Sequence, residues 1–225
     1  MAKRDPLTRE RVLRAALEIA DREGIDGLSM RRLGAALGVE AMSLYHHVAN
    51  KDELLGGLID IVFAEIDLPC DGGWKAAMRA RAISARDALT RHRWAVGLME
   101  SSPAPGAANL GHHDAVLRCL RESGFSVAMA AHAYSALDSY VYGFALTQIT
   151  LPFQTGDQAA EVAEQILGRD VAARYPYLAE IAAEHVMKPG YSYAQEFEYG
   201  LDLVLDGLEK ALAAQDLSSS ATDSM

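Results

Sequence analysis

The chain has little cysteine and no long uncharged apolar run. Its only two cysteines, Cys70 and Cys119, lie far apart and form no Cys-x-x-Cys pattern. This spacing argues against a disulfide framework and a zinc site, so we interpret both as reduced thiols that act as small apolar side chains. No stretch of about 18 apolar residues is free of charge, and the first residues lack an apolar segment, so we expect neither a membrane span nor export. The sequence therefore predicts a cytoplasmic protein.

Strand-like alternation is also absent. Apolar residues recur at helical spacing along almost the whole chain, and clusters of Pro or Gly separate the apolar runs. Half of the 225 residues are hydrophobic, which is enough to bury a sizeable core. These patterns predict an all-α protein.

Positive charge is scarce, but it is unevenly distributed. The net charge of −10 argues at first against a nucleic-acid partner, because Lys and Arg supply most non-specific affinity for phosphate. Residues 1–51, however, carry nine Lys and Arg against seven acids, a net of +2, and the remainder carries −12. This asymmetry is typical of a small DNA-facing module on an acidic body that a duplex would repel.

Four helices are expected near the N-terminus. Thr8 can cap the first, which should end near Glu23 with Gly24 as a left-handed C-terminal cap. The second runs from about 30 to 37, Gly38 breaks the chain, and the third runs from about 40 to 46. Asn50 caps the fourth, with Glu53 placed for a capping box, and this helix should reach about residue 67.

The rest of the chain predicts a second, larger domain. The segment 69–73 is the expected domain joint, since Pro, Cys, Asp and two glycines interrupt the pattern. Further helices are expected near 74–99, 112–123, 126–151, 158–173, 177–187 and 193–214. We therefore expect a DNA-binding domain over 1–50, a connecting helix over 51–68, a second domain over 69–214 and a disordered tail over 215–225.

The second and third helices, separated by a glycine-containing turn, predict a helix-turn-helix. In that motif the first helix braces the second, whose side chains meet base edges in the major groove. Leu44 and Val48 should face inward, which leaves an exposed Met, a Tyr and two His around the short helix. Apolar groups can contact thymine methyls, while hydroxyls and imidazoles can bond phosphates or base edges. The residues on or near the exposed side are Ala41, Met42, Ser43, Tyr45, His46 and His47.

Residues 7–63 resemble the TetR family of transcriptional regulators. The resemblance rests on the segment Gly24 to Leu55, and above all on the spaced set Gly27-Leu, Leu33-Gly-Ala-Ala-Leu-Gly-Val, Leu44-Tyr, His47-Val and Lys51. It implies DNA contacts by side chains of the motif and its flanks, although Tyr45 and His47 could instead pack against the fourth helix. The predicted DNA-binding residues are Ser29, Arg31, Ala41, Met42, Ser43, Tyr45, His46, His47 and Lys51.

The remainder is more weakly similar to the C-terminal domain of the tetracycline repressor. That resemblance implies a small-molecule effector, but two metal-organising histidines of the repressor correspond here to Gly97 and Ser139, neither of which provides an imidazole. We therefore expect an effector other than tetracycline–magnesium, and no cofactor. Adjacent His112 and His113, near Asp114 and Glu100, are poorly placed to share one metal ion, because neighbouring helical side chains diverge by about 100°.

The inner face of the second domain contains material for an effector pocket, which is typically apolar with a few polar groups. Arg81 and Asp138 would be its polar anchors, with solvent exposure or an internal ion pair as the alternative. Trp94 and Met99 could equally belong to ordinary core. The predicted ligand-binding residues are Arg81, Trp94, Met99, Leu117, Tyr134, Leu137, Asp138 and Val141.

The resemblance further implies a homodimer joined by a four-helix bundle of helices 126–151 and 193–214. Both helices carry more apolar surface than one face needs. Tyr140, Phe144, Phe197, Leu201 and Val204 are the predicted interface residues. Two reading heads related by a two-fold axis imply a palindromic operator.

The resemblance favours a DNA-binding regulator, most simply a repressor that a small-molecule effector releases from DNA. Two other functions are alternatives. An enzyme is not favoured, because GxSxG, HExxH, P-loop and Rossmann patterns are all absent from the sequence. The other rival is a small-molecule carrier or a protein-interaction module whose helix-turn-helix has lost its DNA affinity. Salt-dependent DNA binding separates the two, since only a functional head has affinity to lose.

Overall fold

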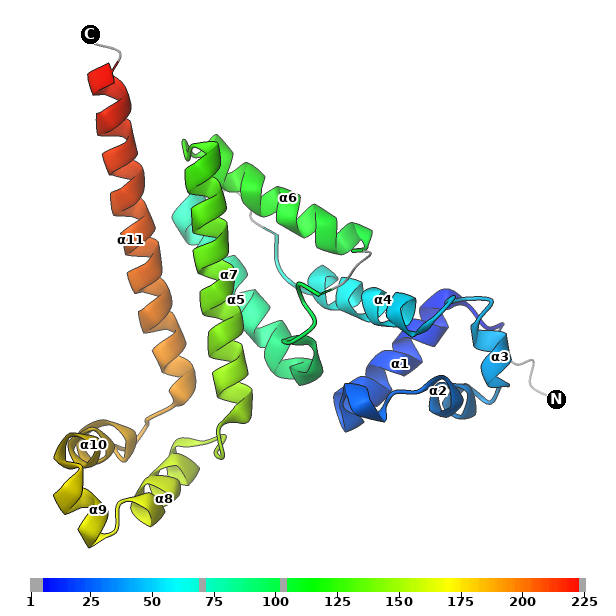
Figure 1. Ribbon diagram of the computed structural model, residues 1–225, viewed down its shortest axis with the longest axis horizontal. Helices are drawn as coiled ribbons and strands as arrows, with labels where there is room; N and C mark the ends of the chain where they lie inside the picture. Colours follow the sequence, from blue (N-terminus) through cyan, green and yellow to red (C-terminus); the bar gives the residue numbers. More distant parts are fainter. Residues whose placement is uncertain (1–5, 69–71, 102–104, 223–225) are drawn as a thin grey trace. The chain divides into compact units, whose positions relative to one another are not determined.

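The computed structural model describes residues 6–68, 72–101 and 105–222, and no strand occurs within these ranges. Helices form most of the described chain (Figure 1). The prediction of an all-α fold is confirmed. By its internal contacts the chain divides into two compact units, one up to Tyr142 and one from Gly143, with the division inside a single long helix.

The first four helices form a small domain around one core. They are α1 (Arg9–Glu23), α2 (Met30–Leu37), α3 (Ala41–Leu44) and α4 (Lys51–Ala64). Thr8 Oγ1 caps α1 by accepting from the backbone N–H of Arg11, as expected from the sequence. The α4 helix ends earlier than the predicted residue 67. The core of this domain consists of Val12, Leu13, Ala16, Ile19, Ala20, Leu28, Leu33, Leu44, Val48, Leu54 and Leu58.

Two glycines determine how closely α2 approaches α3. Gly38 follows α2 in the left-handed conformation, with φ 67° and ψ 35°, which turns the chain sharply before α3. Gly34 lies where a Cβ atom would approach the Val39 carbonyl oxygen to 2.9 Å and the Ala41 nitrogen to 3.2 Å. Gly24 has a positive φ of 74° but a ψ of 170°, so it is not the left-handed helical cap that the sequence suggested.

The next helices are α5 (Trp74–Arg91), α6 (Ala107–Glu122) and α7 (Val127–Thr150). The expected helix 74–99 is corrected, because His92 leaves helical geometry at φ −107° and ψ 62° and only a short 3-10 turn, Arg93–Ala95, follows. The α6 helix begins at residue 107, before the expected 112. In the first unit α4 packs along α6 (Figure 1).

The second unit contains α8 (Gly156–Ile166), α9 (Arg169–Arg174), α10 (Pro176–Ile181) with a π turn at Ala182–Val186, and α11 (Tyr193–Thr222). The single helix expected over 158–173 is interrupted after Ile166. The helix α11 continues to Thr222, so residues 215–222 are helical where the sequence predicted a disordered tail. Residues 223–225 lie outside the described residues.

Two predictions from composition can be located only in part. Cys119 is half-buried and forms no disulfide among the described residues, whereas Cys70 and most of the expected joint at 69–73 lie outside them. None of the described helices is long and apolar enough to cross a membrane.

Candidate nucleic-acid interface

The short helix α3 and the turn after it bury two side chains and expose several others. Leu44 is fully buried and Val48 nearly so, as the sequence predicted, and they hold the segment against the core of the N-terminal domain. Met42 is 72% exposed and Tyr45 is 44% exposed, and His46 is exposed as well. Large apolar and aromatic groups in water on so short a helix indicate a surface that binds a partner.

Cations lie on both sides of this surface. Arg31 on α2 and Lys51 at the start of α4 are exposed, and no hydrogen bond or ion pair is found for either within the described part of the chain. Neighbouring Arg32, by contrast, is paired with Glu23 at the end of α1. Arg31 and Lys51 are therefore available to bind anions.

Other predicted contact residues have structural roles or are less exposed. Ser29 is the N-cap of α2, and its Oγ accepts from the backbone N–H of Arg32 at 3.3 Å. Ala41, Ser43 and His47 are half-buried. The outer surface of the motif therefore depends mainly on Met42, Tyr45 and His46.

A double cap fixes the first turn of α4 and with it Lys51. Asn50 Oδ1 accepts from the backbone N–H of Glu53 at 2.8 Å. The Glu53 carboxylate reaches back to accept from the backbone N–H of Ala49 at 2.7 Å, one residue before the Asn50 nitrogen that a standard capping box would use. This reciprocal cap holds the helix start that carries Lys51 in one position.

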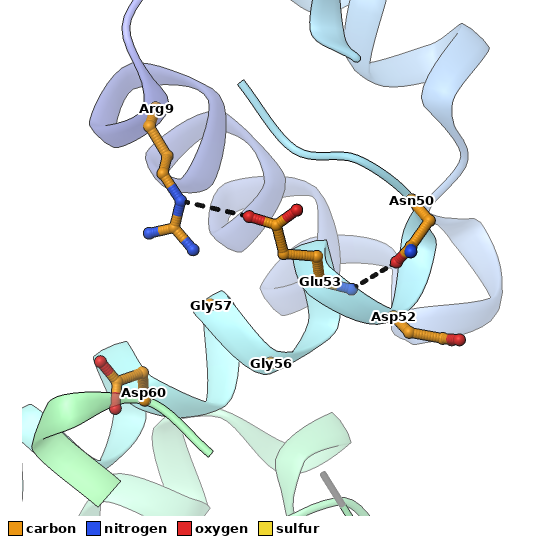
Figure 2. A pocket seen from close by; sticks show the side chains of 8 residues that line it. Arg9, Asn50, Asp52, Glu53, Gly56, Gly57 and Asp60 are labelled. Atoms are coloured by element: carbon orange, nitrogen blue, oxygen red, sulfur yellow. Dashed lines mark hydrogen bonds and ion pairs between the residues drawn. The ribbon is translucent and has the colours of Figure 1, made fainter. Parts of the chain in front are cut away.

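A polar cleft of about 430 Å³ lies beside the start of α4 (Figure 2). Its lining includes Arg9, which forms an ion pair with Glu53 at 3.7 Å, and the carboxylates of Asp52 and Asp60. Three carboxylates against one cation disfavour phosphate binding here. The cleft is therefore distinct in charge from the exposed cations Arg31 and Lys51.

Asp60 at the far end of this cleft joins α4 to α6. Its Oδ1 accepts from the backbone N–H of Asn109 at 2.8 Å, within the first turn of α6, where a carboxylate is favourable. The approach needs glycine at position 106, since a Cβ atom there would overlap the Asp60 carboxylate. Asp60 therefore forms a direct contact between α4 and α6.

A second link joins α1 and α4 to the end of α5 through His92, which is 6% exposed. His92 Nδ1 lies 2.7 Å from Asp21 Oδ1 and Nε2 lies 3.2 Å from Glu65 Oε2. Burial alone would raise the pKa of Glu65, but hydrogen bonds from Arg91 and His92 outweigh it and lower that pKa.

Trp94 also contacts the N-terminal domain, because its Nε1 donates to Asp21 at 2.7 Å. Trp94 therefore packs against the N-terminal core and not beside Arg81 and Asp138, which corrects the expected pocket position.

Arg81 and Asp138, the two expected polar anchors, form a buried ion pair. Arg81 is 1% exposed and Asp138 is 5% exposed, and Arg81 NH1 lies 2.5 Å from Asp138 Oδ1. Arg81 Nε donates to Nε2 of His112 at 2.9 Å. The pair corresponds to one alternative from the sequence, whereas the role of His112 was missed, because the only pattern it belonged to was a His-His pair considered for a metal.

The environment of this trio is rich in rings. His113 lies in hydrogen-bond contact with the Tyr134 hydroxyl, and the Tyr142 hydroxyl donates to Glu100 at 3.0 Å. Burial and nearby carboxylates raise the pKa of Tyr134 and Tyr142, so both phenols keep their protons at neutral pH.

No group of three or more possible metal ligands occurs among the described residues. Of the other predicted pocket residues, Met99, Leu137 and Val141 are buried, and Leu117 is 37% exposed.

The predicted dimer residues divide into two groups. Phe197 and Leu201 are fully buried within the single chain, which corrects the expectation that they face a partner: they form the inward stripe of α11. Phe144 stacks on Tyr193 at 4.9 Å and meets Phe197 edge-on at 5.0 Å, while Tyr140 and Val204 are half-buried. The apolar side chains that α7 and α11 leave exposed include Leu146, Tyr199 and Leu203.

The short helix α3, braced by α2 with its outer side chains exposed, is typical of helix-turn-helix transcriptional regulators. Two family models match the chain: "Bacterial regulatory proteins, tetR family" over residues 12–58 and "Tetracyclin repressor-like, C-terminal domain" over residues 68–212. The chain belongs to the TetR family.

Named relatives support this membership over nearly the whole length. The chain is 36% identical to the HTH-type transcriptional repressor DrrR1 of Streptomyces coeruleorubidus, over 96% of this chain and 82% of the relative. It is 32% identical to the class C tetracycline repressor protein of Escherichia coli, over 91% of each. Among solved structures, ActR of Streptomyces coelicolor in complex with (S)-DNPA is 30% identical with a TM-score of 0.71, covering 93% of this chain and 99% of ActR.

Proposed function

We propose that the protein is a repressor that binds a palindromic DNA operator as a homodimer and leaves it when a small molecule binds the second domain. DNA binding is supported mainly by the side chains exposed on the outer surface of α3. Met42, Tyr45 and His46 are exposed there, and the exposed cations Arg31 and Lys51 flank them. The proposed domains are residues 1–50 for DNA, 51–68 as connection and 69–214 for ligand binding and dimerisation.

Each exposed group has a defined task in the major groove. Arg31 and Lys51 bind phosphates and set the register of the motif, and they carry no sequence information themselves. Met42 meets thymine methyl groups, and Tyr45 and His46 bond base edges or phosphates. Ala41, Ser43 and His47 complete the contact surface at closer range, and Ser29 acts through the N-cap that orients α2.

The apolar surface that α7 and α11 leave exposed supports a homodimer. Leu146, Tyr199 and Leu203 are 52%, 70% and 59% exposed in the single chain, and burying them against a second copy would remove this surface from water. The half-buried Tyr140, Phe144 and Val204 lie on the same two helices. Two reading heads related by a two-fold axis then require a palindrome.

The contacts of α4 support release of DNA by an effector. Asp60 joins α4 to α6, and Asp21, His92 and Glu65 join the N-terminal domain to the end of α5. An effector that shifts α6 therefore moves α4 and the reading head, and a coupling of about 1–3 kcal/mol lowers DNA affinity about 5-fold to 150-fold. The structures of ActR with (S)-DNPA and with actinorhodin support small-molecule binding in this family. We propose an effector other than tetracycline–magnesium.

The test is selection of bound sequences from random duplex DNA by the full chain, repeated with Tyr45→Ala and Lys51→Ala. We expect a palindrome for the wild type, a lost preference at some base positions for Tyr45→Ala, and uniformly weaker binding with a smaller salt dependence for Lys51→Ala. Arg14→Ala is the matched control, because Arg14 is an exposed cation of the same domain that is already paired with Glu10 at 2.6 Å.

The outcome that contradicts the proposal is a folded, dimeric protein that enriches no sequence at low salt. In that case the small-molecule carrier replaces the repressor as the function of the chain. If both variants select the same palindrome as the wild type, the surface that contacts the bases lies elsewhere than on α3.

A further inference from the structure

The buried trio of Arg81, His112 and Asp138 leaves one hydrogen-bonding atom unused on each of two side chains. His112 Nδ1 and Asp138 Oδ2 are buried and have no hydrogen-bond partner of standard geometry among the described residues. The Tyr134 hydroxyl nevertheless lies close enough for a hydrogen bond with Asp138 to help raise the pKa of Tyr134. Buried polar atoms are almost always paired, so two orphaned atoms around one guanidinium indicate a missing group.

The network determines what each orphaned atom can do. A guanidinium N–H can only donate, so Nε2 of His112 accepts from Arg81 and carries no proton. Burial, the charge of Arg81 and the neighbouring His113 lower the pKa of His112 to about 3, so the ring is neutral at physiological pH. Its one proton therefore lies on Nδ1, which makes that atom a donor. Asp138 Oδ2 is an acceptor, because Oδ1 of the same carboxylate is bound to Arg81.

The charge and the shape of the surroundings restrict the missing group further. Arg81 and Asp138 neutralise each other and His112 is uncharged, so a charged ligand would find no counter-charge in the trio. Phe63 lies 5.5 Å from the His112 ring and 5.2 Å from the His113 ring between centroids, and Tyr134 lies 5.4 Å from His113. These rings favour a flat partner.

We propose that the effector is an uncharged ring compound that presents a carbonyl-type acceptor to His112 Nδ1 and a hydroxyl donor to Asp138 Oδ2. This inference rests on the proposed ligand-released repressor and specifies the chemistry of its effector. His112 and Asp138 are the specificity-determining residues, and Arg81 positions both.

The test uses the full chain with ring-¹⁵N-labelled histidine and four fragments of matched size. 3-Hydroxyacetophenone carries both groups, 3-methylacetophenone lacks the donor, 3-ethylphenol lacks the acceptor and 3-hydroxybenzoate is anionic. We expect the free protein to show His112 as the neutral Nδ1–H tautomer, and 3-hydroxyacetophenone to shift its Nδ1 resonance saturably. The two single-group fragments and the anion should bind about tenfold more weakly, the effect of one lost hydrogen bond in a buried site.

A variant inverts the expected preference. In Asp138→Asn the amide oxygen accepts from Arg81, and the amide nitrogen takes the place of Oδ2 as a donor. The preferred fragment should then change from 3-hydroxyacetophenone to 1,3-diacetylbenzene, which presents two acceptors. If Asp138→Asn does not fold, as judged by its circular-dichroism melt, the comparison of four fragments on the wild type still decides.

Two results would overturn the inference. One is a His112 resonance that no fragment moves, which would mean that buried water satisfies both atoms. The other is equal binding of all four fragments. Either result, obtained with protein that still selects a palindromic operator, removes the effector chemistry and leaves the repressor standing. If instead the protein binds the fragments as expected but selects no operator, the repressor function is contradicted and the ligand site is not.

Discussion

The proposed reading head around α3 and the buried core around Arg81 use the same residue types in opposite ways. Around α3, Arg31, Tyr45 and His46 are exposed, and no side-chain hydrogen bond or ion pair is found for them among the described residues. In the core, Arg81, Tyr134 and His112 form hydrogen bonds or ion pairs with side chains of neighbouring helices, and these bonds connect α5, α6 and α7. A residue type therefore does not determine a role. The polar groups of the head remain exposed and can bind a partner from solution. Those of the core bond to each other, except for His112 Nδ1 and Asp138 Oδ2.

The largest effect should come from breaking the buried pair. Arg81→Met leaves the Asp138 carboxylate buried with no counter-charge, so we expect a loss of about 3–5 kcal/mol in the free energy of unfolding, measured by urea titration. The double variant Arg81→Met with Asp138→Leu should recover most of that loss, since an apolar pair of similar volume fills the space. Equal losses in the single and double variants would mean that packing, not charge, accounts for the effect.

The next effect tests the geometry of the head. In Gly34→Ala the new methyl group would approach the Val39 carbonyl oxygen to 2.9 Å, and a backbone atom cannot move aside as a flexible side chain can. We expect about 1–3 kcal/mol of destabilisation, the range for overpacking, together with weaker DNA binding. Gly97→Ala is the matched control, because nothing lies within 4 Å of a Cβ atom at that position. A Gly34→Ala protein with unchanged melting and DNA binding would show that α2 and α3 can separate freely.

Tyr45→Ala should separate DNA affinity from stability. Tyr45 is 44% exposed and no contact of its hydroxyl is found in the described chain, so its removal should leave the unfolding free energy within about 0.5 kcal/mol of wild type. Operator affinity should fall by about 1–3 kcal/mol, measured by fluorescence anisotropy on the selected palindrome. A stability loss larger than the affinity loss would instead favour the packing role that the sequence left open.

Both regions could be predicted in kind from the sequence, but only the head could be predicted in detail. Leu44 and Val48 lie one turn apart, so a local pattern already determined which side chains of α3 remain outside. The contacts of the core span long separations: Arg81 to His112 crosses 31 residues and Asp60 to Asn109 crosses 49. Helical periodicity contains no information about such pairs. The same reason explains the error at α5, since apolar residues continue past Arg91 while His92 leaves the helix and bonds Asp21 and Glu65 from α1 and α4.

The link between the two regions should depend on pH. The pKa of Glu65 is lower in the folded protein than in the unfolded chain, so ionised Glu65 stabilises the fold above its unfolded pKa. That contribution is lost as pH falls through the folded pKa, below about 4.5. The difference in unfolding free energy between wild type and Glu65→Gln should therefore be constant near neutral pH and shrink toward about pH 3. A difference that grows on acidification would reverse the sign and contradict the assignment.

The smallest effect should come from an ion pair of the head. Arg14 and Glu10 lie 2.6 Å apart, one turn from each other on α1, and their side chains are 68% and 79% exposed. Water screens such a pair, so Arg14→Ala should cost no more than about 0.5 kcal/mol, and raising the salt concentration should remove even that. Arg14 and Arg81 form ion pairs of nearly equal length, 2.6 Å and 2.5 Å, so a large ratio between the two losses reflects mainly the burial of Arg81 and its added hydrogen bond to His112. A ratio near one would show that water reaches the Arg81 pair, and the two orphaned atoms beside it would then need no ligand to satisfy them.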